Sequence, residues 1–193
     1  MISSMSSLVT TPPLSTPGGT AFAATLPGAG PFGFFDPLNL VADKSSMEVM
    51  LYREAELAHG RVAMMAAVGY LVQEAFHPIF PVSAGVDGPV IRQLDQVLST
   101  GAGQSAGFVM LLAVFFSEIY RAREGWEEPD DAYYSLREGY LPGDLKFDPL
   151  GVKPAGAEEF AQMQAKELNN GRLAMMAVAG MTAQELVTGG TLF

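Results

Sequence analysis

The 193-residue chain contains no cysteine, only two histidines and few positive charges. The absence of cysteine excludes a disulfide framework, a thiolate metal site and a cysteine nucleophile. With 21 acidic residues against 11 basic ones, the net charge is −10. This acidity argues against nucleic-acid binding, which requires a Lys/Arg surface to neutralise phosphates. No catalytic constellation is evident either, so the sequence does not indicate an enzyme.

Charge is also missing from the beginning of the sequence, where residues 1–35 contain none. The segment is rich in Ser, Thr, Pro, Gly and Ala, and it lacks the basic residues of a secretory signal and the arginines of an organelle transit peptide. We therefore expect residues 1–31 to form an extended N-terminal arm. Residues 189–193 are expected to form a short C-terminal tail.

The sequence has no clean run of about 20 apolar residues, although 49% of it is hydrophobic and only 17% is charged. Helix-forming residues flanked by Pro and Gly nevertheless predict three long helices, at about 46–75, 104–125 and 157–187. Asp43, Ser45 and Ser46 are the N-cap candidates of the first helix. The first and third stretches, of about 30 residues each, are long enough to cross a bilayer while tilted.

The placement of Lys and Arg indicates three membrane crossings. Lys44 and Arg53 lie at the start of the first stretch, and six residues from Arg121 to Lys166 lie from the end of the second stretch to the start of the third, whereas only Arg92 lies between the first and second and none follows the third. An odd number of spans places the two basic regions on one side of the membrane, as the positive-inside rule requires. The predicted fold is thus an all-α membrane protein with three transmembrane helices.

An internal repeat links the first and third stretches. Residues 56–74 (ELAHGRVAMMAAVGYLVQE) and 167–185 (ELNNGRLAMMAVAGMTAQE) are identical at 11 of 19 positions, and the tetrapeptide FDPL precedes both helices, at 35–38 and 147–150. A repeated helix of this kind predicts that the two long helices cross and are related by a pseudo-two-fold axis.

The repeat also explains why charged residues lie within apolar helices. Each copy contains a glutamate followed five residues later by an arginine, Glu56/Arg61 and Glu167/Arg172. Charges at the bilayer centre cost about 2.5–3.5 kcal/mol or more and therefore pair. Five residues separate the two side chains by about 140° on one helix, so pairing within a copy is poor. Crossing helices solve this reciprocally, with Glu56 bound to Arg172 and Glu167 to Arg61.

Further polar side chains recur in the same helices. His59 and Asn170 are equivalent in the repeat, as are Gln73 and Gln184, and Glu118 lies in the middle stretch. Each is a nitrogen or oxygen ligand suited to Mg²⁺ or to an imidazole-binding metal. Any one of them alone is most simply a satisfied polar residue of the core, but the repeated set favours ligands.

A di-iron site is the alternative interpretation of Glu56-x-x-His59. Carboxylate di-iron bundles require a second Glu-x-x-His and two further glutamates. The second copy has Asn170 in place of histidine, which disfavours this alternative.

The strings FGFFDPLNL, ELAHGRVAMM, FSEIYR, LKFDPLG and KELNNGRLAMM together resemble the light-harvesting chlorophyll-binding family of chloroplasts over residues 32–188. In sequence, the two helix motifs are most similar to those of the chlorophyll a/c branch, the fucoxanthin- or peridinin-type antennas. The resemblance implies one chlorophyll-binding domain over 32–188, located in the thylakoid membrane as a multi-pass protein with a stromal N-terminus.

The resemblance also implies roles for individual residues. It makes Glu56 and Glu167 ligands of chlorophyll Mg²⁺, each paired to the arginine of the other helix. Further Mg²⁺ ligands would be His59, Glu118, Asn170 and Gln184. Carotenoid end groups would lie at the FDPL segments, and carotenoids would pass along the helix grooves. The residues expected there are Asp36, Pro37, Asp148, Pro149, Met65 and Met176, together with Met64 and Met175.

The sequence departs from the family pattern at two sites that do not involve the residues named above. Met110 stands where some members have a polar group that helps to bind a pigment, and no histidine follows the third helix. Gln73 and His77 are possible additional ligands.

The implied function is a light-harvesting antenna that binds chlorophyll a, chlorophyll c and carotenoids and transfers excitation energy. Its expected partners are a photosystem I or II core, neighbouring antenna subunits and thylakoid lipids, with no nucleic acid. Two alternatives stay open at this point: a photoprotective member of the same family that dissipates excitation, and a membrane structural protein or enzyme without pigment.

Overall fold

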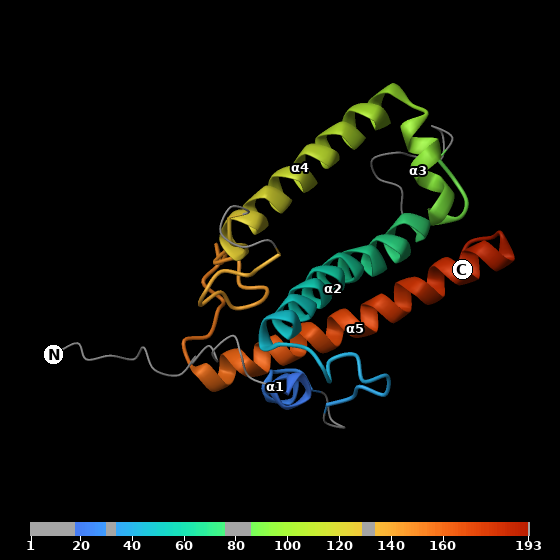
Figure 1. The fold of residues 1–193 in the computed structure, drawn as a ribbon. Helices are drawn as coiled ribbons and strands as arrows, with labels where there is room; N and C mark the ends of the chain where they lie inside the picture. The colour runs from blue at the N-terminus through green and yellow to red at the C-terminus, as the bar shows by residue number, and fades with distance from the viewer. Residues whose placement is uncertain (1–17, 30–33, 76–85, 129–133, 193) are drawn as a thin grey trace. The chain divides into compact units, whose positions relative to one another are not determined.

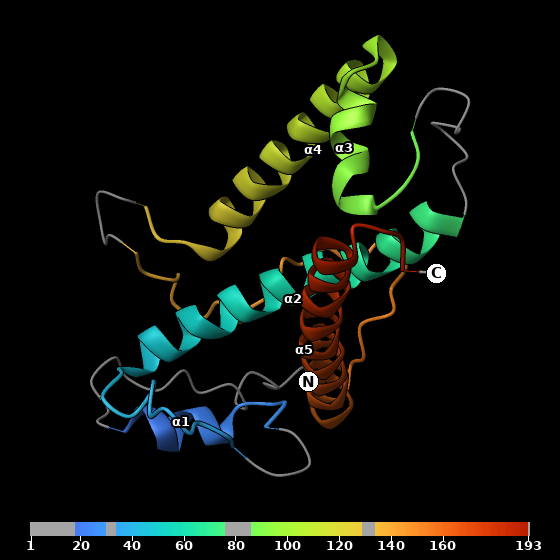
Figure 2. The same ribbon diagram turned by 90° about the vertical axis from the view of Figure 1, so that its right-hand side faces the viewer.

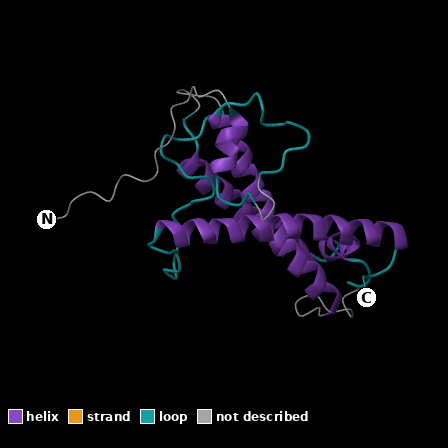
Figure 3. Cartoon of the chain, turned by 90° about the horizontal axis from the view of Figure 1, so that it is seen from below, coloured by secondary structure: helices purple, strands orange, loops and turns teal. Residues whose placement is uncertain are grey.

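The computed structural model describes residues 18–29, 34–75, 86–128 and 134–192. Within these ranges the chain contains helices and loops and no strand (Figures 1 and 3). The helices are α1 (Gly19–Thr25), α2 (Ser46–Ala75), α3 (Val90–Leu98), α4 (Gly101–Gly125) and α5 (Ala157–Thr188). The predicted all-α class is therefore confirmed for the described chain. Of its helices, α4 is the one that is long and apolar enough, by composition, to cross a membrane.

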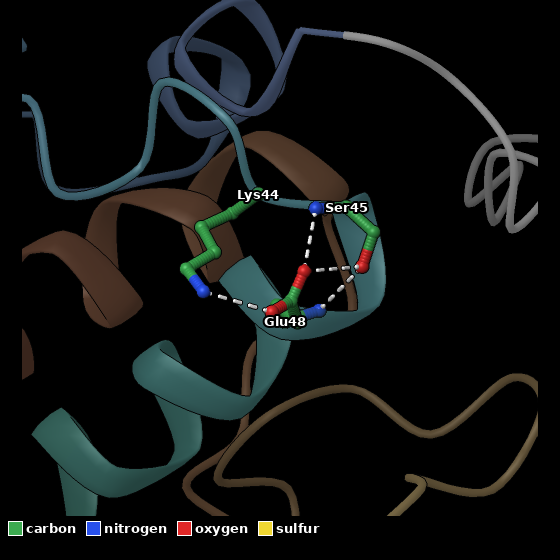
Figure 4. A network of polar contacts seen from close by, with 3 residues as sticks. All are labelled: Lys44, Ser45 and Glu48. Atoms are coloured by element: carbon green, nitrogen blue, oxygen red, sulfur yellow. Dashed lines mark hydrogen bonds and ion pairs between the residues drawn. The ribbon is translucent and has the colours of Figure 1, made fainter.

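Ser45 is the residue that starts α2 (Figure 4). Its Oγ accepts a hydrogen bond from the Glu48 amide at 3.2 Å, and its own amide donates to Glu48 Oε2 at 2.9 Å. This reciprocal arrangement is a capping box, and it satisfies two amides that the helix leaves unpaired. Lys44 Nζ lies 3.0 Å from Glu48 Oε1, and this hydrogen bond raises the pKa of the Lys44 ammonium.

The predicted second helix, expected to begin at about residue 104, begins earlier because Thr100 caps it. Thr100 Oγ1 accepts a hydrogen bond from the Gly103 amide at 3.0 Å, and the Thr100 carbonyl accepts one from Gln104. α4 therefore starts at Gly101 despite two glycines in its first turn. The third predicted helix, 157–187, matches α5 to within one residue.

Two short helices were not expected from the sequence. α1 lies inside the segment predicted to be extended, and the expectation of an irregular arm is wrong for Gly19–Thr25. Its GTAFAAT sequence is locally rich in alanine, whereas the prediction relied on the Ser, Thr, Pro and Gly content of the whole segment. α3 lies in the connection between the first and second long helices.

The chain divides into two compact units, the first comprising Met1–Glu56 and Arg121–Lys166. In this unit Gly19 approaches the carbonyls of Val41 and Lys44 so closely that a side chain could not be accommodated. Glu54 is buried, and its Oε2 accepts hydrogen bonds from Tyr140 Oη at 3.1 Å and from the Gly143 amide at 2.6 Å. This carboxylate thus joins α2 to the segment that precedes α5.

The second unit comprises Leu57–Tyr120 and Glu167–Phe193. In this unit α2 and α5 are in contact at Gly60 and Gly171; their ribbons run next to each other in Figure 1 and cross in Figure 2. Tyr70 Oη and Thr182 Oγ1 are hydrogen-bonded at 2.7 Å across this contact. The unit therefore contains the second copy of the sequence repeat and all of the first except Glu56, packed against each other.

Candidate functional site

Gly60 and Gly171, which are equivalent in the repeat, face each other where α2 meets α5. A Cβ added to Gly60 would lie 3.1 Å from Gly171 Cα, and one added to Gly171 would lie 3.0 Å from Gly60 Cα. Ala63 and Ala174, the next equivalent pair, are both buried. Small residues let the two backbones approach closely, as they do in membrane helix pairs.

An ion pair lies beside this glycine contact. Arg61 Nε donates to Glu167 Oε1 at 2.7 Å, and both side chains are about one-third exposed (34% and 33%). This is one of the two reciprocal pairs that the spacing predicts. The close backbone approach makes it possible, since it brings side chains from residues 106 positions apart into bonding distance.

The other glutamate of the repeat, Glu56, is half-buried on α2. Its Oε2 lies 3.7 Å from Nε of Arg53, one turn earlier on the same helix. Arg172, its predicted partner, donates from Nη1 to Asn169 Oδ1 at 3.4 Å. The Glu56–Arg172 pair stays a prediction.

The remaining predicted Mg²⁺ ligands have exposed side chains on the long helices. His59 and Gln73 lie on α2, Glu118 on α4, and Asn170 and Gln184 on α5. These residues thus lie at the surface of the described chain. No group of three or more His, Asp or Glu residues able to hold a bare metal ion occurs in the described chain. His77 lies outside the described residues.

Apolar side chains cover the outer faces of the same helices in matched positions. Val62 and its repeat equivalent Leu173 are both 63% exposed, while Met65 and Met176 are 69% and 68% exposed. Every residue of α4 from Phe108 to Tyr120 is also exposed. Such extensive bare apolar surface marks an interaction region, because soluble proteins rarely expose large contiguous patches.

The two FDPL segments form the same turn. Asp36 accepts hydrogen bonds from the amides four and five residues later, at 3.0 and 3.1 Å, and Asp148 does the same at 3.0 and 2.9 Å. The third residue after each aspartate, Asn39 or Gly151, has a positive φ of 52° or 64°. Asn and Gly tolerate this conformation best.

These turns clarify what the FDPL residues do. The aspartate carboxylates organise the backbone, and the amides of Lys153 and Val152 hold the pKa of Asp148 below its ordinary value. Phe35 and Phe147, each immediately before the aspartate, are 83% and 79% exposed. Contact of Asp36, Pro37, Asp148 or Pro149 with a carotenoid stays a prediction.

Two further functional candidates, Glu74 and Glu185, escaped the sequence analysis. Glu185 of α5 is buried, and its two oxygens accept hydrogen bonds from the Val90 and Ile91 amides at 3.1 and 3.0 Å. Glu74 of α2 accepts a bond from the Leu192 amide at 2.8 Å. Each glutamate thus binds the chain that follows the other helix. Glu74 and Glu185 are the last identical pair of the repeat, and this match is the sequence signal that could have revealed them.

Comparisons with known proteins agree with this arrangement. The model of the family described as chlorophyll A-B binding protein matches residues 22–186. A fucoxanthin-chlorophyll a-c binding protein of Isochrysis galbana is 47% identical over 88% of this chain and 80% of its own length. The light-harvesting complex stress-related protein 1 of Chlamydomonas reinhardtii is 45% identical over 90% of this chain and 69% of its own length. The chain therefore belongs to the chlorophyll a/b-binding protein family.

Proposed function

We propose that this protein is a light-harvesting antenna that binds chlorophylls and carotenoids in the thylakoid membrane and passes excitation energy to a photosystem. The observation that carries the proposal is the Arg61–Glu167 ion pair at the contact of two repeated apolar helices. Family membership supports the same function, and two similar relatives carry fucoxanthin-chlorophyll a-c binding protein as their name.

The paired glutamate fits a chlorophyll Mg²⁺. Arg61 binds Oε1 of Glu167, and a carboxylate has a second oxygen that can serve as a metal ligand. The arginine offsets the carboxylate charge, so that the ligand can be buried under a pigment at lower cost. Chlorophyll supplies the absorption of light and the transfer of excitation, while the protein sets its position and orientation.

Glu56 is the corresponding ligand of the first repeat in this proposal, with Arg172 as its partner. His59, Glu118, Asn170 and Gln184 hold further chlorophylls, and Gln73 is an additional candidate. Their exposure on apolar helices supports this assignment, because a polar atom surrounded by bare hydrophobic surface can bind the metal of a largely apolar pigment. Chlorophyll a and chlorophyll c are the proposed pigments, in keeping with the names of the fucoxanthin-type relatives.

Carotenoids are the proposed occupants of the matched apolar faces of α2 and α5. Met65 and Met176 lie on these faces at nearly equal exposure, and methionine adapts well to irregular apolar partners. Phe35 and Phe147, the exposed phenylalanines of the FDPL turns, would contact the carotenoid end groups. A pseudo-two-fold relation between α2 and α5 would give two similar carotenoid sites.

The proposal includes three membrane crossings, by α2, α4 and α5. α4 has the required length and hydropathy. α2 and α5, with 30 and 32 residues, have the length, and pigments bound to their polar residues would complete their apolar surface. A photosystem core and neighbouring antenna subunits are the proposed partners.

A photoprotective role is the second candidate. Light-harvesting complex stress-related proteins 1, 3.1 and 3.2 of Chlamydomonas reinhardtii are 43–45% identical to this chain, close to the value for the fucoxanthin-type relative. Fluorescence lifetimes of the pigmented protein at neutral and acid pH distinguish the two roles. Strong quenching at acid pH would favour energy dissipation.

Refolding of the full chain with chlorophylls and carotenoids tests the antenna proposal. We expect a coloured complex in which carotenoid excitation produces chlorophyll fluorescence, and we expect Glu167→Ala and Arg61→Ala to lose the same chlorophyll. Glu158→Ala, on the exposed first turn of α5, is the matched control and should keep every pigment. Failure to bind pigment, or loss from only one member of the pair, would contradict the proposal.

A further inference from the structure

Arg53 is a cation beside Glu56 that the repeat does not duplicate. Its Nε lies 3.7 Å from Glu56 Oε2, and its Nη1 donates to the Pro27 carbonyl at 2.8 Å. Only 15% of the side chain is exposed. The guanidinium is therefore held from two directions, by the helix that contains the glutamate and by the segment that follows α1.

The second copy of the repeat differs at this position. Glu167 is the equivalent of Glu56, and the residue three positions before it is Gln164, which is neutral. The repeat thus preserves the glutamate and the arginine five residues later, but it supplies a cation one turn earlier only in the first copy. The two glutamates consequently differ in the residue one turn before them on the same helix, a cation for Glu56 and a neutral amide for Glu167.

We propose that Arg53 is a positioning residue that tunes the pigment bound at Glu56 and makes the two glutamate sites electrostatically unequal. The inference rests on the proposed function, in which both glutamates are chlorophyll ligands. A positive charge a few ångströms from a carboxylate interacts strongly with it where the local dielectric constant is low. Arg53 draws negative charge away from the carboxylate oxygens of Glu56, an effect that the neutral Gln164 cannot exert at Glu167.

Unequal sites have a functional consequence. Two chlorophylls with the same kind of ligand but different surrounding charge absorb at different energies, and excitation then moves preferentially from the higher to the lower. Arg53 can keep one geometry because Pro27 holds the end of its side chain. The segment after α1 therefore contributes to the pigment site although it contains none of the predicted ligands.

Low-temperature absorption of the refolded, pigmented full chain tests the inference. Glu56→Ala and Glu167→Ala first assign one chlorophyll band to each site by its loss. Arg53→Gln is expected to displace the Glu56 band and leave the Glu167 band in place, while Arg53→Lys keeps the charge and the wild-type band. Gln164→Arg adds a charge to the second copy and should displace the Glu167 band in the opposite direction.

The outcomes separate this inference from the proposed function. If Glu56→Ala costs no chlorophyll, the assignment of Glu56 as a ligand is wrong and the inference falls with it. If Glu56→Ala costs one chlorophyll but Arg53→Gln leaves its band unmoved, the inference alone is overturned. Equal displacement of both bands by Arg53→Gln would indicate a general distortion and would also overturn it. If Arg53→Gln does not fold, Gln164→Arg decides the question.

Discussion

Replacement of Glu185 by alanine should release α3 from the end of α5. Glu185 is 1% exposed, and its carboxylate accepts hydrogen bonds from both the Val90 and Ile91 amides. These amides belong to the first turn of α3, where no partner exists within the helix. The carboxylate also interacts favourably with the positive end of the helix dipole.

The magnitude follows from the two hydrogen bonds. A bond to a charged group contributes about 1.5–3 kcal/mol. Val90 and Ile91 are only half-buried, so water can replace part of the loss, and we take the lower value for each bond. Glu185→Ala should then weaken the attachment of α3 by about 3 kcal/mol, which corresponds to roughly a hundredfold change in the opening equilibrium. Glu185→Gln keeps one acceptor oxygen and should lose about half of this free energy.

Hydrogen exchange measured by mass spectrometry on the peptide covering α3 is the suitable assay, because it reports local opening without requiring global unfolding. Protection of α3 should fall strongly in Glu185→Ala, moderately in Glu185→Gln and hardly at all in Glu158→Ala, an exposed glutamate of the same helix. Unchanged protection in Glu185→Ala would refute the reasoning, as would an equal loss in the Glu158 control.

Two other predictions concern the helix contact and the second FDPL turn. Gly171→Ala places a Cβ 3.0 Å from Gly60 Cα, so the two helices must separate slightly. We expect this to destabilise the protein by about 1–3 kcal/mol, measured as the temperature at which it loses pigment. An unchanged temperature would contradict the close contact. The hydrogen bond from the Lys153 amide lowers the pKa of Asp148. The ionised Asp148 carboxylate therefore stabilises the turn fully above the ordinary aspartate pKa of about 3.9, and this stabilisation is lost as the pH falls through the lower pKa of Asp148 in the folded protein. Protection of the Lys153 amide, measured relative to its intrinsic exchange rate at each pH, should fall below about pH 4. Asp148→Asn should already show weaker protection at neutral pH, without this dependence.

Much of the site was predictable because its signals are local or repeated. The five-residue spacing of Glu167 and Arg172, copied at Glu56 and Arg61, indicated pairing between helices, and the Arg61–Glu167 bond is present at 2.7 Å. This inference required only helix geometry and the cost of an unpaired charge in an apolar environment. The structure adds that Gly60 and Gly171 of the same motif lie against each other.

The short helices were less predictable, since each depends on contacts outside its own sequence. α3 has nine residues, too few for a stable isolated helix in water, and its first turn is completed by Glu185 from far along the chain. α1 is shorter still, and it packs where Gly19 meets the backbone of residues 41–44. Composition could not reveal either partner.

The sequence by itself determined the family, the helical class, the Arg61–Glu167 pair and the repeat, because periodicity and spacing are encoded in neighbouring residues. Only the tertiary structure decided how the unmatched parts are used. It placed Arg53 between Glu56 and the Pro27 carbonyl, and it directed Glu74 and Glu185 to the backbone that follows the opposite helix. The physical reason is that a backbone amide or carbonyl carries no sequence signature, so a side chain that binds one from a distant segment is recognised only once the chain is folded.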